Sequence, residues 1–199
     1  MPTRTRNRSI GVSQSQFAAA LLSFLGMIAS GCSADSDTQT PDDPSSLCAS
    51  GVLEADLEAG PATGPGVDPE TGEILPPPAG SVYTVSTTYG VRRAGDAVAE
   101  RYGQIFGAVE AQLASQPGLV ALQLAFSPSC GSGRTLAVWA STEQMYEFVV
   151  SPPHAAAMDA VDELVEPGYG VTHWEASTTN EMTFAEGARR LAASVASTR

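Results

Sequence analysis

The two histidines of this 199-residue chain are its best candidates for general acid–base chemistry. His154 follows two prolines in the stretch FVVSPPHAAAM, which covers residues 148–158, and His173 lies in VTHWEA, residues 171–176. An imidazole titrates close to neutral pH, so either ring has the chemistry of a base. The alternative is structural: His154 starts or packs a helix, and His173 lies on a solvated or subunit-facing surface.

The three cysteines suggest covalent roles rather than a metal site. They contain no CxxC pair, so the sequence carries no zinc signature and we expect no bound metal. Cys48 and Cys130 would form a disulfide in an exported chain, the alternative being two free thiols. Cys32 follows the small residues ASG, which resembles the cleavage site of a bacterial lipoprotein, where the cysteine is lipidated.

Residues 1–31 have the pattern of a signal peptide. Three arginines within residues 4–8 precede the apolar run FAAALLSFLGMI, residues 17–28, which is too short to span a bilayer as a mature helix. We therefore expect export and a lipid anchor on Cys32 at the bacterial cell envelope, periplasmic or on the outer surface. An ordinary secretory signal with an incidental cysteine is the other interpretation.

The charge of the chain argues against nucleic acid as a partner. Its formal net charge is −12, with 22 acidic residues against 10 basic residues, and all of the basic residues are arginine. Three of these arginines would leave with the signal, which makes the mature chain still more acidic. A chain of this charge is repelled by phosphate backbones.

Composition divides the rest of the chain in two. Residues 32–80 are dense in Pro, Gly, Asp, Ser and Thr, and we expect a disordered tether there because such a segment buries little apolar surface. Residues 81–199 read as one folded domain. Apolar alternation predicts strands over 83–91, 119–126, 135–140 and 171–176, and spacings of three and four predict helices from Asp96, from Ser141 and after Thr183.

This order predicts an α+β fold, the ferredoxin-like β-α-β-β-α-β arrangement with a four-stranded antiparallel sheet and its helices on one face. Pro152 and Pro153 should break the second helix, with Ser151 capping its continuation. The other face of the sheet must be covered. A second copy packed sheet to sheet would cover it, giving a homodimer, and the extra C-terminal helix is the other candidate.

The stretches TLAVWASTEQMYEFVVSPPHAAAM, VTHWEAS and FAEGARRL resemble an uncharacterised bacterial branch of the dimeric α/β barrel superfamily. That superfamily includes antibiotic-biosynthesis-type monooxygenases and DUF3291 proteins. The resemblance covers about residues 81–191. It is carried by an aromatic, histidine and Ala-Met pattern, which consists of Trp139, Phe148, His154, Ala157, Met158, His173, Trp174 and Glu175.

The resemblance implies a cofactor-independent monooxygenase-like enzyme acting on a small organic substrate, with His154, and also His173, as catalytic groups. The implied pocket residues are two strand tyrosines and three helix or strand-end residues, namely Tyr83, Tyr89, Trp139, Phe148 and Met158. Haem-degrading relatives place Trp and His where this chain has Phe148 and Met158, so we expect no haem and no other cofactor. A non-catalytic dimer that binds a small apolar or aromatic molecule, or is purely structural, is the alternative.

Overall fold

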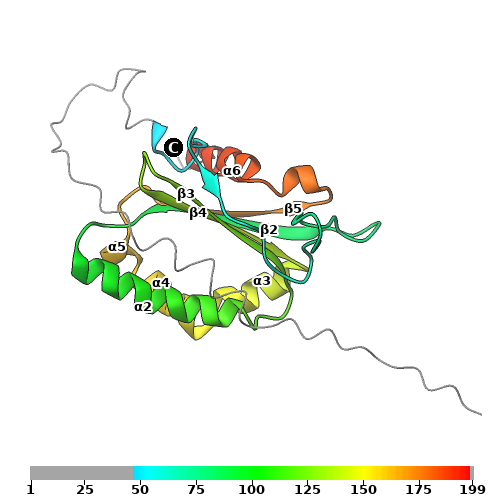
Figure 1. The fold of residues 1–199 in the computed structure, drawn as a ribbon, viewed down its shortest axis with the longest axis horizontal. Coiled ribbons are helices and arrows are strands. Elements are labelled where there is room, and N and C mark those ends of the chain that lie inside the picture. The colour runs from blue at the N-terminus through cyan, green and yellow to red at the C-terminus, as the bar shows by residue number, and fades with distance from the viewer. Residues whose placement is uncertain (1–46, 198–199) are drawn as a thin grey trace, which may run out of the picture.

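The computed structural model describes residues 47–197, so the expected signal peptide and Cys32 lie outside the described part. Five strands and five α-helices follow one another in this part of the chain (Figure 1). The strands are β1 (Glu58–Ala59), β2 (Tyr83–Val91), β3 (Leu119–Ser127), β4 (Ser132–Trp139) and β5 (Gly170–Ala176). The helices are α2 (Asp96–Leu113), α3 (Thr142–Val149), α4 (Pro152–Asp159), α5 (Val161–Leu164) and α6 (Phe184–Ser197), with a 3₁₀ turn, η4, at Thr179–Glu181.

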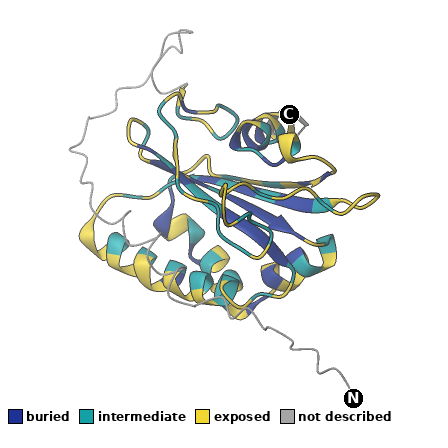
Figure 2. Cartoon of the chain, turned by 45° about the vertical axis from the view of Figure 1, so that its right-hand side comes forward, coloured by how far each residue is buried: buried dark blue, intermediate teal, exposed yellow. Residues whose placement is uncertain are grey.

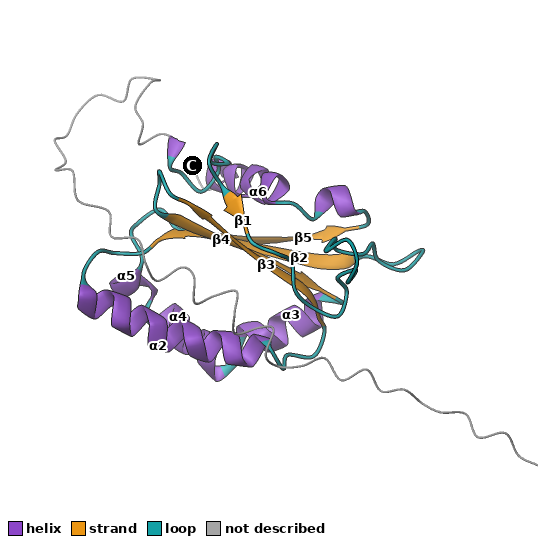
Figure 3. Ribbon diagram, viewed as in Figure 1, coloured by secondary structure: helices purple, strands orange, loops and turns teal. Residues whose placement is uncertain are grey.

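The strands form one antiparallel sheet in the order β1-β3-β4-β2-β5. Without the two-residue β1, this is the strand order of the predicted ferredoxin-like fold, and the α+β prediction is confirmed. Helices α2 to α5 lie under one face of the sheet and α6 lies over the other (Figures 1 and 3). The central strands are the most deeply buried part, whereas the outer surfaces of the helices are exposed (Figure 2).

Local sequence explains where the second helical region begins and breaks. The Ser141 hydroxyl accepts a hydrogen bond of 3.3 Å from the main-chain N–H of Gln144, which caps α3 as the sequence predicts. The helix ends at Val149, and a new helix starts with Pro152 at its first position, where a missing N–H costs nothing. The predicted break is therefore present, and it places His154 in a first helical turn.

The core consists of apolar clusters on both sides of the sheet. On the α6 side, residues of all four long strands pack with Met182 and Phe184. On the helix-layer side, one cluster joins the ends of β3 and β4 to Met145 and Phe148 of α3. A third cluster, with Ile105 of α2 and Leu164 of α5 among its buried members, holds the helices to one another.

The prediction of a disordered tether up to residue 80 is wrong for residues 47–80. Glu58 and Ala59 pair with β3, and further main-chain bonds from Gly60, Thr63 and Gly66 continue along the same edge of the sheet. Leu57, Val67 and Ile74 pack on the core cluster of the α6 side. The segment is polar in composition, but these few apolar residues are spaced to contact the sheet, and its backbone bonds are supplied by β3.

The sheet face expected to carry a second copy is covered by the chain itself. Helix α6 seals it with Leu191, which is 1% exposed, and Gly187 approaches Thr87 so closely that a Cβ atom would lie 3.0 Å from its hydroxyl oxygen. Residues 47–75 cover the β3 and β4 side of the same face. Because both covers belong to the same chain, this face leaves no room for a sheet-to-sheet dimer.

Candidate functional site

His154 lies in the first turn of α4, and its ring is fixed by a main-chain contact. Its Nδ1 is 2.9 Å from the carbonyl oxygen of Val149, the last residue of α3. Since a carbonyl oxygen only accepts, the neutral ring must carry its proton on Nδ1, which leaves the lone pair on Nε2. The ring is half-buried and meets the Phe148 ring edge-on, with 4.8 Å between centroids. The α3–α4 break thus presents an oriented imidazole.

The protonation of His154 is shifted toward the neutral form. Burial lowers the pKa of the ring below its usual value of 6.5, and the hydrogen bond to the Val149 carbonyl opposes this shift only in part. Desolvation disfavours the imidazolium form, because the charge loses its water shell. At neutral pH, His154 is therefore a neutral base with a free Nε2 lone pair.

The sheet beneath the helices carries a row of hydroxyl groups on β2. Thr84 Oγ1 lies 2.8 Å from Oγ1 of Thr142 at the start of α3, which fixes the face toward which Thr84 points. Alternate residues of a strand share a face, so Ser86 and Thr88 point toward the helices as well. Both are only half-buried, although their strand is central.

Hydrogen bonds fix two of these hydroxyls and leave protons free to donate. The indole Nε1 of Trp139 donates to Ser86 Oγ at 2.9 Å. Thr88 Oγ1 and Thr135 Oγ1 lie 2.8 Å apart, so one of them donates and the other keeps its own proton. A hydroxyl that accepts one bond still has a proton to donate. The row can therefore present donors to an oxygen atom of a bound molecule.

The hydroxyl row lies between two apolar groups of residues. Trp139 and Phe148 belong to the cluster at one end of the sheet. The cluster that joins α2, α4 and α5 has buried members from residues 105 and 160–165, all of them in the helical layer. Ser86, Thr88 and Thr135 are polar residues that stay half-buried beneath the helical layer.

His173 borders the hydroxyl row on the edge strand β5. It is the direct register partner of Ser86, so the two side chains share a face of the sheet. His173 is exposed, and its ring stands nearly perpendicular to that of Tyr146, with 5.9 Å between centroids. It borders the row at the edge of the sheet, where its ring contacts Tyr146.

The structure does not bring all of the predicted pocket residues together. Tyr83 and Tyr89 lie on the opposite face of the sheet, because they are odd-numbered members of β2. Trp139 and Phe148 stack with 5.2 Å between centroids and are 1% and 8% exposed, so they form core more than pocket wall. Met158 is 42% exposed on α4. The prediction that Tyr83 and Tyr89 line one pocket together with the other three residues is therefore wrong.

Sequence reasoning missed the hydroxyl row as a unit. Its signal is the alternation of Thr84, Ser86 and Thr88 with the apolar residues of the same strand, which marks one polar face under a helical layer. It also missed the buried ion pair of Glu54 with Arg134 on the other face. These two residues are far apart in sequence and share no motif, so no local signal pairs them.

Residues 47–197 contain neither a membrane-spanning helix nor a metal-binding cluster. No helix in this range is long and apolar enough to cross a membrane. The same range contains no group of three His, Cys, Asp or Glu side chains arranged to hold a metal ion. The disulfide between Cys48 and Cys130 is present in the structure, and its geometry is described below.

Comparisons with known proteins give structural likenesses only. No family model matches the chain, and no curated protein matches it. SnoaB from Streptomyces nogalater, a cofactor-independent oxygenase, is similar at 17% identity over 49% of this chain and 96% of its own, with a TM-score of 0.41.

Two further solved structures are similar at the same level. A candidate antibiotic biosynthesis monooxygenase from Caulobacter crescentus matches at 18% identity over 49% of this chain and 92% of its own, with a TM-score of 0.42. A Mycobacterium tuberculosis protein matches at 16% identity over 46% and 92%, with a TM-score of 0.41. These likenesses concern the fold only. The chemistry proposed for this chain depends on its own residues.

Proposed function

We propose that this chain is an exported, lipid-anchored envelope protein whose domain oxygenates a small organic molecule without a cofactor. The molecule would bind between the hydroxyl row of β2 and the helical layer, with His154 as the general base. The observation that carries this proposal is the Nδ1 contact of His154 with the Val149 carbonyl. It leaves Nε2 as a lone-pair donor on a half-buried ring whose pKa is lowered.

The chemistry requires a substrate with an acidic C–H bond. His154 Nε2 removes a proton from a methylene group that lies beside a carbonyl or phenol, which leaves a carbanion. The carbanion gives an electron to O₂, and recombination of the two radicals forms a carbon–oxygen bond. Loss of water then converts the methylene to a carbonyl, so that one oxygen atom of O₂ enters the product and the other leaves as water.

The hydroxyl row supplies the complementary electrostatics. Removing the proton places negative charge on the substrate's carbonyl or phenol oxygen, and a donor directed at that oxygen stabilises the charge. Ser86 is suited to this role because Trp139 already donates to its oxygen, which leaves the Ser86 proton available.

Export and anchoring are proposed from the first thirty-two residues. The basic start, the short apolar run and the ASGC stretch support a lipid on Cys32. Two acyl chains at one cysteine would give stable attachment. Metabolic labelling with a radioactive fatty acid tests this: wild-type chain should take up label, and Cys32→Ser should not. Labelling of both, or of neither, contradicts the anchor.

Binding without turnover is the second candidate. The observation in its favour is the set of hydroxyl groups on β2, which can hold the oxygen atoms of a ligand without any chemical step. In this case the hydroxyl row would hold the oxygen atoms of an apolar ligand, and His154 would only accept a hydrogen bond.

Oxygen uptake by the purified full chain separates the two candidates. The probes are cyclic 1,3-diketones and hydroxylated aromatic ketones that carry a methylene group. Turnover should consume one O₂ per substrate, and His154→Gln should lower the rate by about 10²–10⁴-fold, the usual contribution of a general base. His173→Gln is the matched comparison and should lower the rate far less. Equal rates for wild type and His154→Gln contradict the catalytic proposal, and saturable binding without oxygen uptake supports the second candidate.

A further inference from the structure

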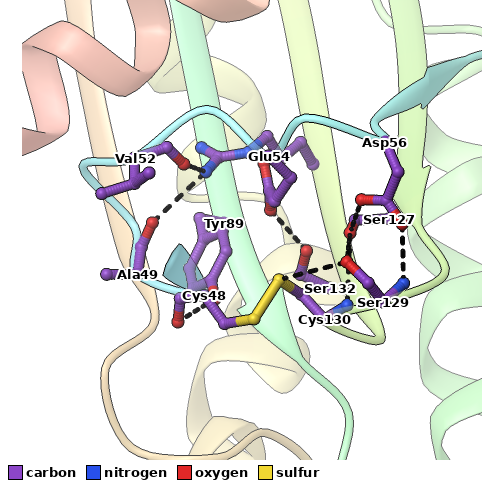
Figure 4. The surroundings of a disulfide bond; sticks show 11 residues. Cys48, Ala49, Val52, Glu54, Asp56, Tyr89, Ser127, Ser129, Cys130 and Ser132 are labelled. Carbon is purple, nitrogen blue, oxygen red and sulfur yellow. Dashed lines mark hydrogen bonds and ion pairs between the residues drawn. A yellow bond between two sulfur atoms is a disulfide. The ribbon is translucent and has the colours of Figure 1, made fainter. Parts of the chain in front are cut away.

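Residues 47–56, here called the latch, lie across the α6 side of the sheet and are joined covalently to it (Figure 4). A disulfide connects Cys48 to Cys130 in the turn between β3 and β4, with 5.4 Å between Cα atoms and a sequence separation of 82. Helix α6 lies beside the latch: a Cβ atom on Gly51 would come within 2.8 Å of the Ala192 main chain.

The latch supplies the partners of a charged group buried in the sheet. The side chains of Arg134 on β4 and Glu54 in the latch are 0% and 1% exposed, and Arg134 Nε donates to Glu54 Oε2 at 2.7 Å. Arg134 also donates to the main-chain oxygens of Ser50 and Val52, at 3.1 and 2.6 Å. Every hydrogen-bond partner that the described residues give the Arg134 side chain therefore comes from the latch.

Three more hydrogen bonds, one to Cys48 and two to Asp56, help to seat the latch. The Tyr89 hydroxyl donates to the main-chain oxygen of Cys48 at 2.8 Å. The Asp56 carboxylate accepts from the Ser127 hydroxyl at 2.6 Å and from the Ser129 N–H at 2.8 Å (Figure 4). The latch therefore docks through polar groups on β2, on β4 and at the β3–β4 turn.

Apolar burial holds the latch weakly, in contrast to the segment that follows it. Leu47 and Leu53 are 62% and 43% exposed. Beyond residue 56, by contrast, Leu57, Val67 and Ile74 pack on the core, and main-chain bonds to β3 add to this anchor. Burying an ion pair costs desolvation that roughly cancels its Coulomb attraction, so Glu54 and Arg134 contribute little net binding of the latch. The disulfide therefore adds a covalent restraint to a segment that is otherwise seated by hydrogen bonds and by the close packing of Gly51 on α6.

We propose that the Cys48–Cys130 pair is a redox latch, which closes residues 47–56 over Arg134 when it is oxidised and releases them when it is reduced. In closing, the two thiols lose two protons and two electrons to an external disulfide, which becomes two thiols, and the Cys48–Cys130 bond forms. In the reduced chain, water replaces the latch as the hydrogen-bond partner of Arg134, while residues 57–75 stay on the sheet.

Closure also builds a cavity that the open chain lacks. The cavity has a volume of about 320 Å³ and lies between latch residues 48–50 and the end of β2 with the loop before β5. Tyr89, Glu166 and Tyr169 line its other side. One wall is the latch itself, so release of the latch removes the cavity. The cellular setting, an oxidising envelope, rests on the proposed export, whereas the latch itself can be measured on the purified chain.

Hydrogen exchange on the full chain, read by mass spectrometry of its peptides, tests the latch with and without a dithiol reductant. Reduction should speed exchange in residues 47–56 by at least about 100-fold, while residues 57–75 and the four long strands change by less than about threefold. The double variant Cys48→Ser/Cys130→Ser should show the open pattern without reductant. Unchanged exchange in residues 47–56 overturns the proposal. Equal acceleration throughout the sheet also overturns it, because the disulfide would then be a staple of the whole domain.

A second pair of variants keeps the thiols intact. Gly51→Val would press its side chain on the Ala192 main chain and should open residues 47–56 in the oxidised chain. Leu47→Ala changes an exposed residue of the latch and should leave exchange as in the wild type. If Gly51→Val shows wild-type exchange in residues 47–56, the seating described here is incorrect. Because none of these readouts involves the signal peptide or oxygen uptake, the latch and the proposed function fail independently.

Discussion

The indole Nε1 of Trp139 donates a 2.9 Å hydrogen bond to the hydroxyl of Ser86, across the two central strands of the sheet. Trp139 is 1% exposed, so its N–H has no access to water and depends on this one acceptor. The bond fixes the Ser86 oxygen and leaves the Ser86 proton for another partner. A core aromatic residue thereby orients a polar group of the candidate site.

Ser86→Ala should destabilise the domain and also weaken ligand binding. The substitution leaves the buried Trp139 N–H without an acceptor, which costs about 1–3 kcal/mol. Trp139→Phe removes the donor. In the Trp139→Phe chain, Ser86→Ala should therefore lower the free energy of unfolding by at least about 0.5 kcal/mol less than it does in the wild type. Denaturant unfolding of the wild type, both single variants and the double variant measures the coupling. Additive costs would show that the bond contributes nothing to stability.

Helix α6 should keep the domain monomeric through this face of the sheet. Leu191→Ala should lower the free energy of unfolding by about 2–5 kcal/mol, because Leu191 is buried between α6 and the sheet. A chain ended before residue 183 should expose Val85, Val138 and Trp174 and self-associate. Sedimentation at micromolar concentration should show monomer for the intact chain and larger species for the shortened one. A dimer of the intact chain that persists after Val85→Asp would have to use another surface.

The first turn of α6 should lose stability in acid. Hydrogen bonds from Arg189, and then from Arg190, lower the pKa of Glu186 to about 2. The folded pKa is below the ordinary value of 4.5 for a glutamate, so the stabilisation is complete above pH 4.5 and is lost as the pH falls toward 2. Glu186→Gln should cost about 0.5–1 kcal/mol at pH 7, since the pairs are partly exposed. Thermal unfolding should show that the stability difference between the wild type and Glu186→Gln becomes smaller at low pH. A difference that stays constant with pH would mean that the substitution acts through packing and not through charge.

Much of the fold can be predicted because its signals are local. The alternation in β2 and β3, the Ser141 cap and the Pro152-Pro153 break each depend on residues within a few positions of one another. The course of residues 47–80 cannot be predicted in this way. Their composition suits a tether, and their place on the sheet depends on contacts such as Glu54 with Arg134, which are non-local.

The candidate site also combines features that local sequence predicts with features that depend on non-local contacts. Histidine chemistry identifies His154, but the proton position on its ring depends on where α3 ends, since the Val149 carbonyl sets it. The two-residue period of a strand predicts that Tyr83 and Tyr89 share one face of the sheet and that Ser86 lies on the other. Which segments cover that face is not a local signal: α6 and residues 47–56 cover the side of Tyr83 and Tyr89.

The protonation state of His154 is the most direct test of the proposed base. Nitrogen-15 NMR of the imidazole ring, recorded as a function of pH, reports both the tautomer and the pKa. We predict the tautomer with the proton on Nδ1 and a pKa below 6.5. A proton on Nε2 in the neutral ring would contradict the proposed base, because the lone pair would then lie on Nδ1, which faces the Val149 carbonyl. A pKa of 6.5 or above would contradict the lowering of the pKa by burial.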